Sequence, residues 1–225
     1  MNIEYQSNME LQKFQYYPMI QLFRKYVGED FERDVRDLMN NELVISVSGG
    51  LCTGKTTLTK MLSEYYKLET YSVGNEFRIL AKNRHVSIEE FVGYLETDPD
   101  MATGYDTITS YRTIKLMSSG GQNIKGLIVE GRLTGWYSIL LEQMGRENVV
   151  RILLESDEPT KIKRIMKRHD ISKNDSIAML VRDQQDKCRW KNEFGISYDD
   201  HSIYHYIYEN NDECSLESFM KNLEI

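Results

Sequence analysis

From residue 43 onward, hydrophobic positions fall into two kinds of pattern along the chain. Short runs rich in β-branched and aromatic residues predict strands at 43–47, 70–73, 127–130, 149–154 and 204–208. Between these runs, apolar residues at helical spacing predict helices at about 55–66, 75–82, 87–96, 104–118, 134–144, 158–168, 174–193 and 215–223. Strands that alternate with helices are typical of βαβ units, so we expect an α/β fold with a parallel sheet flanked by helices.

The first 42 residues have a different pattern. Pro18 can begin a helix that ends near Gly28, and a second short amphipathic stretch follows it. Their apolar faces carry Ile20, Phe23 and Val27 in the first stretch, and Phe31, Val35 and Leu38 or Met39 in the second. Two interpretations stay open: a helical hairpin packed on the main domain, or a surface for a protein partner or for self-association.

Composition narrows the class of protein. The formal net charge of −7 argues against nucleic acid as the main partner, because phosphate contacts require a basic surface. The three cysteines are widely spaced and form no CxxC pair, which is typical of a reducing compartment. No apolar run is long enough to span a membrane, and the N-terminus lacks the charge order of a signal peptide. We therefore expect a cytoplasmic protein.

The segment after the first predicted strand matches the phosphate-binding pattern GxxxxGK[ST], followed by a predicted helix. It comprises Gly49, Gly50, Leu51, Cys52, Thr53, Gly54, Lys55, Thr56 and Thr57. Glycines let consecutive N–H groups turn toward an anion at a helix N-terminus. We expect Lys55 to reach the β- and γ-phosphates of a nucleoside triphosphate and the Thr56 hydroxyl to coordinate Mg²⁺.

Glu130 ends the third predicted strand next to this loop and is the candidate for holding Mg²⁺, directly or through water. A helix cap or a salt bridge is the alternative for this side chain. A guanine-reading motif is a weaker interpretation of residues 172–175. Ser172 and Asp175 are better explained as a capping box that opens the helix at 174–193.

A basic segment lies between Lys161 and Lys191, with ten of the 28 Lys and Arg residues and four acids. The acids are Asp170, Asp175, Asp183 and Asp186. Arg164 and Arg168 share one helical face, and Arg182, Asp186 and Arg189 form a stripe. Such a segment is either a solvated face or a set of arginines that stabilise a transferring phosphoryl group.

Two further arginines follow strands. Arg78 lies just past the second predicted strand and Arg132 just past the third. In open α/β sheets, ligands bind beyond the carboxyl ends of the strands. Both side chains are therefore expected to point toward the ligand of the Gly49–Thr57 loop.

The loop at Gly49–Thr57 and several segments after it resemble, in their order and spacing, the nucleoside monophosphate kinases, and most closely the archaeal-type cytidylate kinase family. The resemblance runs from Leu43 almost to the C-terminus. Besides the loop, the matching segments are Ser72-x-Gly74-x-x-Phe77-Arg78, Ser87-Ile88-Glu89-Glu90-Phe91, Glu130-Gly131-Arg132-Leu133-x-Gly135-Trp136, Arg182-Asp183-x-x-Asp186-x-x-Arg189, and Phe194-Gly195-Ile196 leading into Asp199-Asp200-x-Ser202-x-Tyr204. It implies a P-loop kinase domain at 43–225 with a five-stranded parallel sheet, an NMP-binding insertion at about 75–118 and a LID at about 170–197. The helical extension at 1–42 has no counterpart in it.

The resemblance also implies roles for individual residues. Arg78 and Arg132 match positions that grip the monophosphate, and Asp186 matches one that bonds the acceptor's sugar. Arg182 and Arg189 match LID arginines at the transferring phosphoryl group, and Arg168 is expected near the donor base or phosphates. The segment 98–112 only loosely resembles the one that reads cytosine. Its polar candidates are Asp100, Asp106 and Arg112, for which a surface position is the alternative.

These observations predict an enzyme that uses ATP and Mg²⁺ to phosphorylate a small nucleoside monophosphate, CMP or dCMP. Catalysis is expected to rest on Lys55, Arg132, Arg182 and Arg189. Two alternatives remain: another small-molecule kinase on the same scaffold, and a nucleotide-binding subunit without activity, which engages a partner through residues 1–42.

Overall fold

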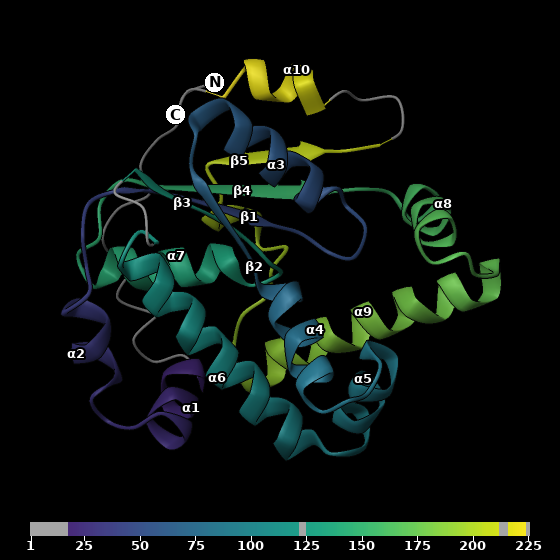
Figure 1. The fold of residues 1–225 in the computed structure, drawn as a ribbon, viewed down its shortest axis with the longest axis horizontal. Helices are drawn as coiled ribbons and strands as arrows, with labels where there is room; N and C mark the ends of the chain where they lie inside the picture. The colour runs from purple at the N-terminus through teal and green to yellow at the C-terminus, as the bar shows by residue number, and fades with distance from the viewer. Residues whose placement is uncertain (1–17, 122–124, 212–215, 224–225) are drawn as a thin grey trace.

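The computed structural model describes residues 18–121, 125–211 and 216–223. Five parallel strands form one sheet in the order β2-β3-β1-β4-β5 (Figure 1). They are β1 (Leu43–Ser48), β2 (Glu69–Ser72), β3 (Gly126–Glu130), β4 (Val149–Glu155) and β5 (Tyr206–Glu209). The predicted parallel sheet is confirmed. Strand β5 begins two residues later than predicted because His201–Ile203 form a 3₁₀ turn, η2, and Tyr204 is its C-cap.

The predicted helices are all present in the described part of the chain. They are α1 (Pro18–Tyr26), α2 (Phe31–Arg36), α3 (Lys55–Tyr66), α4 (Val73–Asn83), α5 (Ile88–Thr97), α6 (Pro99–Ser118), α7 (Thr134–Gln143), α8 (Glu158–His169), α9 (Lys173–Glu193) and α10 (Leu216–Lys221). Helix α6 begins five residues earlier than predicted. Asp98 caps it by accepting from the N–H of Met101, and Pro99 fits the first turn.

Both faces of the sheet are buried along the three central strands β1, β3 and β4, as expected for parallel strands. One face packs against α3 and α10, and the other against α7, with α6, α1 and α2 beyond it (Figure 1). Along β4, Ile152 and Leu154 belong to the first face and Leu153 to the second. The alternation that sets a strand's two faces therefore divides the core into two layers.

The N-terminal hairpin packs on the main domain. Phe23, Phe31 and Val35 are fully buried in the core layer that contains α6 and α7. The N–H of Met19 donates to the carbonyl of Phe194 just past α9, and Ser118 Oγ donates to the carbonyl of Val35 at 2.6 Å. Residues 18–42 thus form a helical hairpin packed on the main domain, which was the first of the two interpretations. Residues 1–17 lie outside the described part of the chain.

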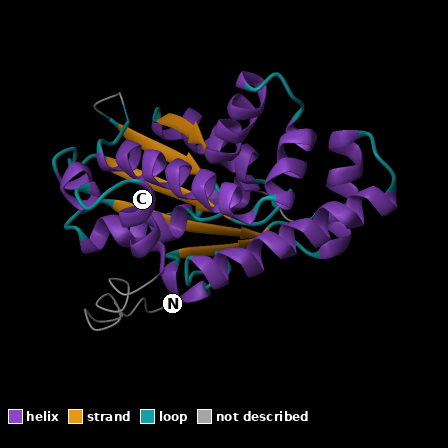
Figure 2. Cartoon of the chain, turned by 90° about the horizontal axis from the view of Figure 1, so that it is seen from below, coloured by secondary structure: helices purple, strands orange, loops and turns teal. Residues whose placement is uncertain are grey.

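Helices extend beyond one end of the sheet, the end to which the strand arrows point in Figure 2. Helices α4, α5 and α6 leave the end of β2, and α8 and α9 leave the end of β4. Ser172 caps α9 as predicted, by accepting from the N–H of Asp175, while the Asp175 carboxylate accepts from Ser172 Oγ at 2.6 Å, so the structure shows the serine half of the predicted capping box. None of the described helices combines the length and the apolar character needed to span a lipid bilayer.

Candidate active site

The Gly49–Thr57 loop connects β1 to α3 and has left-handed backbone at three positions. The φ angles are 146° at Gly49, 55° at Cys52 and 99° at Gly54. A Cβ at Gly49 would lie 2.3 Å from the carbonyl oxygen of Leu154, and one at Gly54 would lie 2.2 Å from Asn210 Nδ2. Gly54 is the N-cap residue of α3, and no side chain forms a capping hydrogen bond at this end of the helix. The first-turn N–H groups of α3 therefore point into a concave loop, a geometry that suits a phosphate.

Side chains from distant segments brace this loop. Asn210 Nδ2 donates to the carbonyl of Thr53 at 2.8 Å, from just past β5. Arg164 of α8 donates to the carbonyl of Cys52 at 3.3 Å and to Ser156 Oγ at 3.0 Å. The loop's conformation is thus held by the ends of β4 and β5 as well as by its own sequence.

Lys55 lies in the first turn of α3 and curls over the loop. Its Nζ donates to the carbonyl of Gly50 at 2.6 Å. Burial lowers the pKa of Lys55 to about 8, and the nearby charge of Arg132 adds to this effect. An anion placed against this ammonium would be stabilised by two close positive charges.

Thr56 and Glu130, the two candidate Mg²⁺ ligands, lie next to each other. Thr56 Oγ1 donates to the two carboxylate oxygens of Glu130 at 3.0 and 2.9 Å. Glu130 is 7% exposed and lies at the end of β3. A hydroxyl and a carboxylate are hard oxygen ligands of the kind that Mg²⁺ prefers. In the described residues, no group of three or more His, Cys, Asp or Glu side chains is arranged to hold a metal ion.

Arg132 lies between two carboxylates of α9. Its Nη2 is 2.6 Å from Asp183 Oδ1, and its Nη1 is 3.4 Å from Asp186 Oδ2. The guanidinium also stacks 5.4 Å from the ring centre of Trp190. Burial opposes the charge of Arg132, but the two carboxylates outweigh it and raise its pKa. Arg132 therefore stays charged in a half-buried position.

Sequence reasoning assigned no role to Asp183, which the structure places at the centre of the site. Its Oδ2 accepts from the N–H of Leu51 at 3.1 Å and from Tyr198 Oη at 3.4 Å. The available signal was that Asp183 lies next to the arginine stripe of a basic helix. Periodicity did not show that this acid faces the loop, because Leu51 and Asp183 are 132 residues apart.

Toward its C-terminal end, α9 also contacts α6. Arg189 Nη1 lies 2.7 Å from Asp106 Oδ2, and its Nη2 lies 3.2 Å from Asp186 Oδ1. Trp190 Nε1 donates to the same Asp106 oxygen at 2.8 Å. Burial raises the pKa of Asp106, while Arg189 and Trp190 oppose that rise. The surface position considered for Asp106 is therefore wrong, because two partners from α9 cover its carboxylate.

The remaining candidates lie farther from the loop. Arg182 pairs with Glu96 and so joins α9 to α5. Arg78 is exposed on α4, and Arg168 is exposed in the last turn of α8. Arg164, which lies one turn before Arg168 in α8, contacts the loop through the carbonyl of Cys52.

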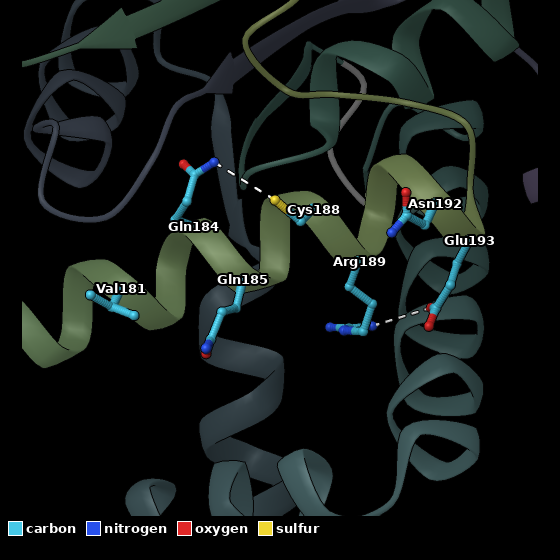
Figure 3. Close-up of a pocket in the computed structure, with 7 residues that line it drawn as sticks. All are labelled: Val181, Gln184, Gln185, Cys188, Arg189, Asn192 and Glu193. Atoms are coloured by element: carbon cyan, nitrogen blue, oxygen red, sulfur yellow. Dashed lines mark hydrogen bonds and ion pairs between the residues drawn. The ribbon is translucent and has the colours of Figure 1, made fainter.

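Two cavities flank these groups. One of about 460 Å³ lies beside the start of α3 and is lined by Gly54, Thr57, Met61, Arg164, Asn210, Leu216 and Glu217. The other, of about 520 Å³, runs along α9 and is lined by Val181, Gln184, Gln185, Cys188, Arg189, Asn192 and Glu193 (Figure 3). Arg189 and Glu193 approach each other along this groove, at 3.5 Å. The first cavity thus opens from the loop and the second from the arginine stripe.

Solved structures share the fold of this chain. A protein of Eubacterium ventriosum described as uncharacterized superposes with a TM-score of 0.54 at 17% identity, covering 80% of this chain and 94% of its own. The protein TT1252 of Thermus thermophilus superposes with a TM-score of 0.51 at 12% identity, covering 83% of this chain and all of its own. At these identities the likeness concerns the fold alone.

Sequence relatives are more specific. Proteins named cytidylate kinase from Pyrococcus horikoshii and Methanococcus vannielii are both 33% identical to this chain over 168 residues. The matches cover 74% of this chain, and 79% and 90% of those proteins. A model of the cytidylate kinase-like family matches residues 44–212, which include the Gly49–Thr57 loop, Arg132 and the charged face of α9. The chain therefore belongs to the cytidylate kinase-like family.

Proposed function

We propose that this protein transfers the γ-phosphoryl group of ATP to the 5′-phosphate of CMP or dCMP. The observation that carries the proposal is the arrangement of Lys55, Thr56 and Glu130 around one loop, with Arg132 held beside it. Membership of the cytidylate kinase-like family supports a nucleoside monophosphate as acceptor. On the spacing of its cysteines, we place the enzyme in the cytoplasm.

The donor binds at the loop in this proposal. The N–H groups of the loop cradle its phosphates, apart from that of Leu51, which is bonded to Asp183, and Lys55 neutralises the β- and γ-phosphates. Thr56 and Glu130 hold Mg²⁺, which when bound supplies positive charge to the donor phosphates. The 460 Å³ cavity next to Gly54 and Arg164 is where the donor's base fits, and Arg168, one turn after Arg164 on α8, is the second basic residue proposed for the donor.

The acceptor binds between β3, α4 and α9. Arg132 and Arg78 grip its phosphate, and Asp186 bonds its sugar. A bidentate guanidinium–phosphate contact is strong and directional, so it orients the attacking oxygen as well as binding it. The helices of residues 75–118 form the NMP-binding part in this proposal, and residues 170–197 form the LID.

The chemistry needs no strong general base, because a 5′-phosphate is already ionised at neutral pH. The oxygen of the acceptor phosphate attacks the γ-phosphorus of ATP, and ADP leaves. Lys55, Arg182 and Arg189 then offset the charge that develops on the transferring group. Arg182 lies with its partner Glu96 on an exposed face, so it must move inward to take part.

A screen of all common nucleoside monophosphates with Mg²⁺ and ATP tests the proposal. We expect CDP or dCDP as the main product, detected by chromatography. As a control, the Lys55→Ala protein is expected to keep its melting temperature but to lose turnover by at least a hundredfold. Turnover of a different small molecule in preference to any monophosphate supports another kinase. Failure to bind any monophosphate supports a nucleotide-binding subunit instead.

A further inference from the structure

Asp183 joins three parts of the site that come from distant segments of the chain. It lies in the middle of α9, and its side chain is only 7% exposed. One carboxylate oxygen accepts from the N–H of Leu51, and the other pairs with Arg132 at 2.6 Å. The carboxylate therefore sets the distance between a loop amide and the guanidinium that follows β3.

The loop is shaped to let this carboxylate approach. A Cβ at Gly50 would lie 3.0 Å from Asp183 Oδ2 and 3.0 Å from Tyr198 Oη, closer than packed side chains normally come. Gly50 does not have a left-handed φ, so its backbone conformation is open to other residues. The close approach of Asp183 and Tyr198 thus explains why residue 50 is a glycine.

We propose that Asp183 is a positioning residue: it fixes Arg132 relative to the loop and thereby aligns the acceptor phosphate with the γ-phosphate of the donor. This inference rests on the proposed function, in which Arg132 grips the acceptor. Asp186 also contacts Arg132, but at 3.4 Å, and it shares its charge with Arg189. A misplacement of about 1 Å between reacting groups costs on the order of a hundredfold in rate.

The measurement that isolates this role is the ratio of acceptor phosphorylation to ATP hydrolysis. Water attacking the γ-phosphorus does not depend on Arg132, whereas the acceptor phosphate does. A smaller fraction of folded enzyme lowers both rates equally and leaves the ratio unchanged. A purely structural role for Asp183 therefore predicts no change in the ratio.

The first variant is Asp183→Asn in the full chain, which keeps an oxygen for the N–H of Leu51 and removes the charge that holds Arg132. With Mg²⁺, ATP and CMP present, we expect the ratio of CDP to released inorganic phosphate to fall at least tenfold. Asp199→Asn is the matched control. It removes a carboxylate that pairs with Lys187 of the same helix, and its ratio should stay within twofold of wild type.

A second variant keeps the test valid if Asp183→Asn does not fold. Gly50→Ala pushes the carboxylate aside without removing its charge, and we expect a lower ratio in the same direction. Where Asp183→Asn does fold, the double variant should be no worse than the more affected single variant, because both substitutions act through one contact. A ratio within twofold of wild type in the folded variants overturns the positioning role. If the wild-type protein forms no diphosphate, the proposed function is wrong, and this inference fails with it.

Discussion

At the scale of single residues, the charged groups of the site hold one another in place. Arg132 lies half-buried between Asp183 and Asp186, and Asp186 in turn contacts Arg189. Removing one member therefore leaves a buried neighbour without its partner, which costs stability as well as function. The effect of replacing one of these charged residues therefore has to be compared with that of a second variant that preserves the charge.

Arg132 provides such a pair of variants. Arg132→Ala should raise the KM for CMP and lower kcat, because a bidentate contact contributes about 2–3 kcal/mol to binding and alignment. It should also lower the melting temperature, because Asp183 is left buried beside an uncharged side chain. Arg132→Lys should restore most of the stability but not the KM, because an ammonium lacks the planar fork.

Steady-state kinetics and thermal denaturation of the two proteins check this prediction. The affinity for ATP should change little in both. An equal loss of ATP and CMP affinity would assign Arg132 to the donor side.

At the scale of elements, the sequence predicted most of what local patterns determine. The strands, the helices and the capping serine of α9 follow from periodicity and from nearby turn residues. The meeting of Thr56 and Glu130 was also predictable, because parallel strands β1 and β3 end at the same edge of the sheet. The contacts of Asn210 with Thr53 and of Asp183 with Leu51 were not, because they join residues that are 157 and 132 positions apart.

A half-buried histidine just before the edge strand β5 contacts β4. His205 Nδ1 lies 3.2 Å from the N–H of Arg151, and its Nε2 lies 2.7 Å from Nη2 of the same residue. Both ring nitrogens thus face N–H groups, and an added ring proton would point at a donor. Burial, with the charge of Arg151 as a second cause, lowers the pKa of His205 to about 4.

This depressed pKa gives stability a defined pH dependence. Above the ordinary pKa of about 6.5 the ring is neutral in both states, and its contribution is fully present. As the pH falls from 6.5 toward 4, the unfolded chain gains a proton that the folded chain excludes, so the contribution is lost. After allowance for partial exposure, we expect a loss of about 1–2 kcal/mol from this group.

Denaturant unfolding at pH 7 and pH 5 measures the effect. A His205→Gln protein should show a smaller drop between the two pH values than wild type. Equal drops in the two proteins would mean that other groups carry the pH dependence.

At the scale of the whole molecule, the hairpin α1–α2 is part of the core, although the family match begins after it. Phe23 packs on Phe31 at 5.3 Å between ring centres, and both are fully buried. The hairpin contacts α6 and the residue that follows α9, so it links the two helices that flank the proposed acceptor site.

Phe23→Ala should therefore lower the free energy of unfolding by about 3–5 kcal/mol, because it leaves a cavity in this layer. Gln21→Ala, at an exposed position of the same helix, is the control and should change stability by less than about 0.5 kcal/mol. Denaturant unfolding checks both proteins. If Phe23→Ala unfolds like wild type, the hairpin does not belong to the cooperative unit.

The packing of this hairpin has a practical consequence for any shortened form of the protein. A chain cut at residue 44, where the family match begins, would remove the buried side chains of the hairpin from the core layer that also holds Ile114, Met117 and Phe194. An apolar patch exposed on the surface promotes self-association and aggregation. The smallest well-behaved enzyme thus includes Pro18 and does not start where the family match begins, so expression trials and partner searches should keep the hairpin attached.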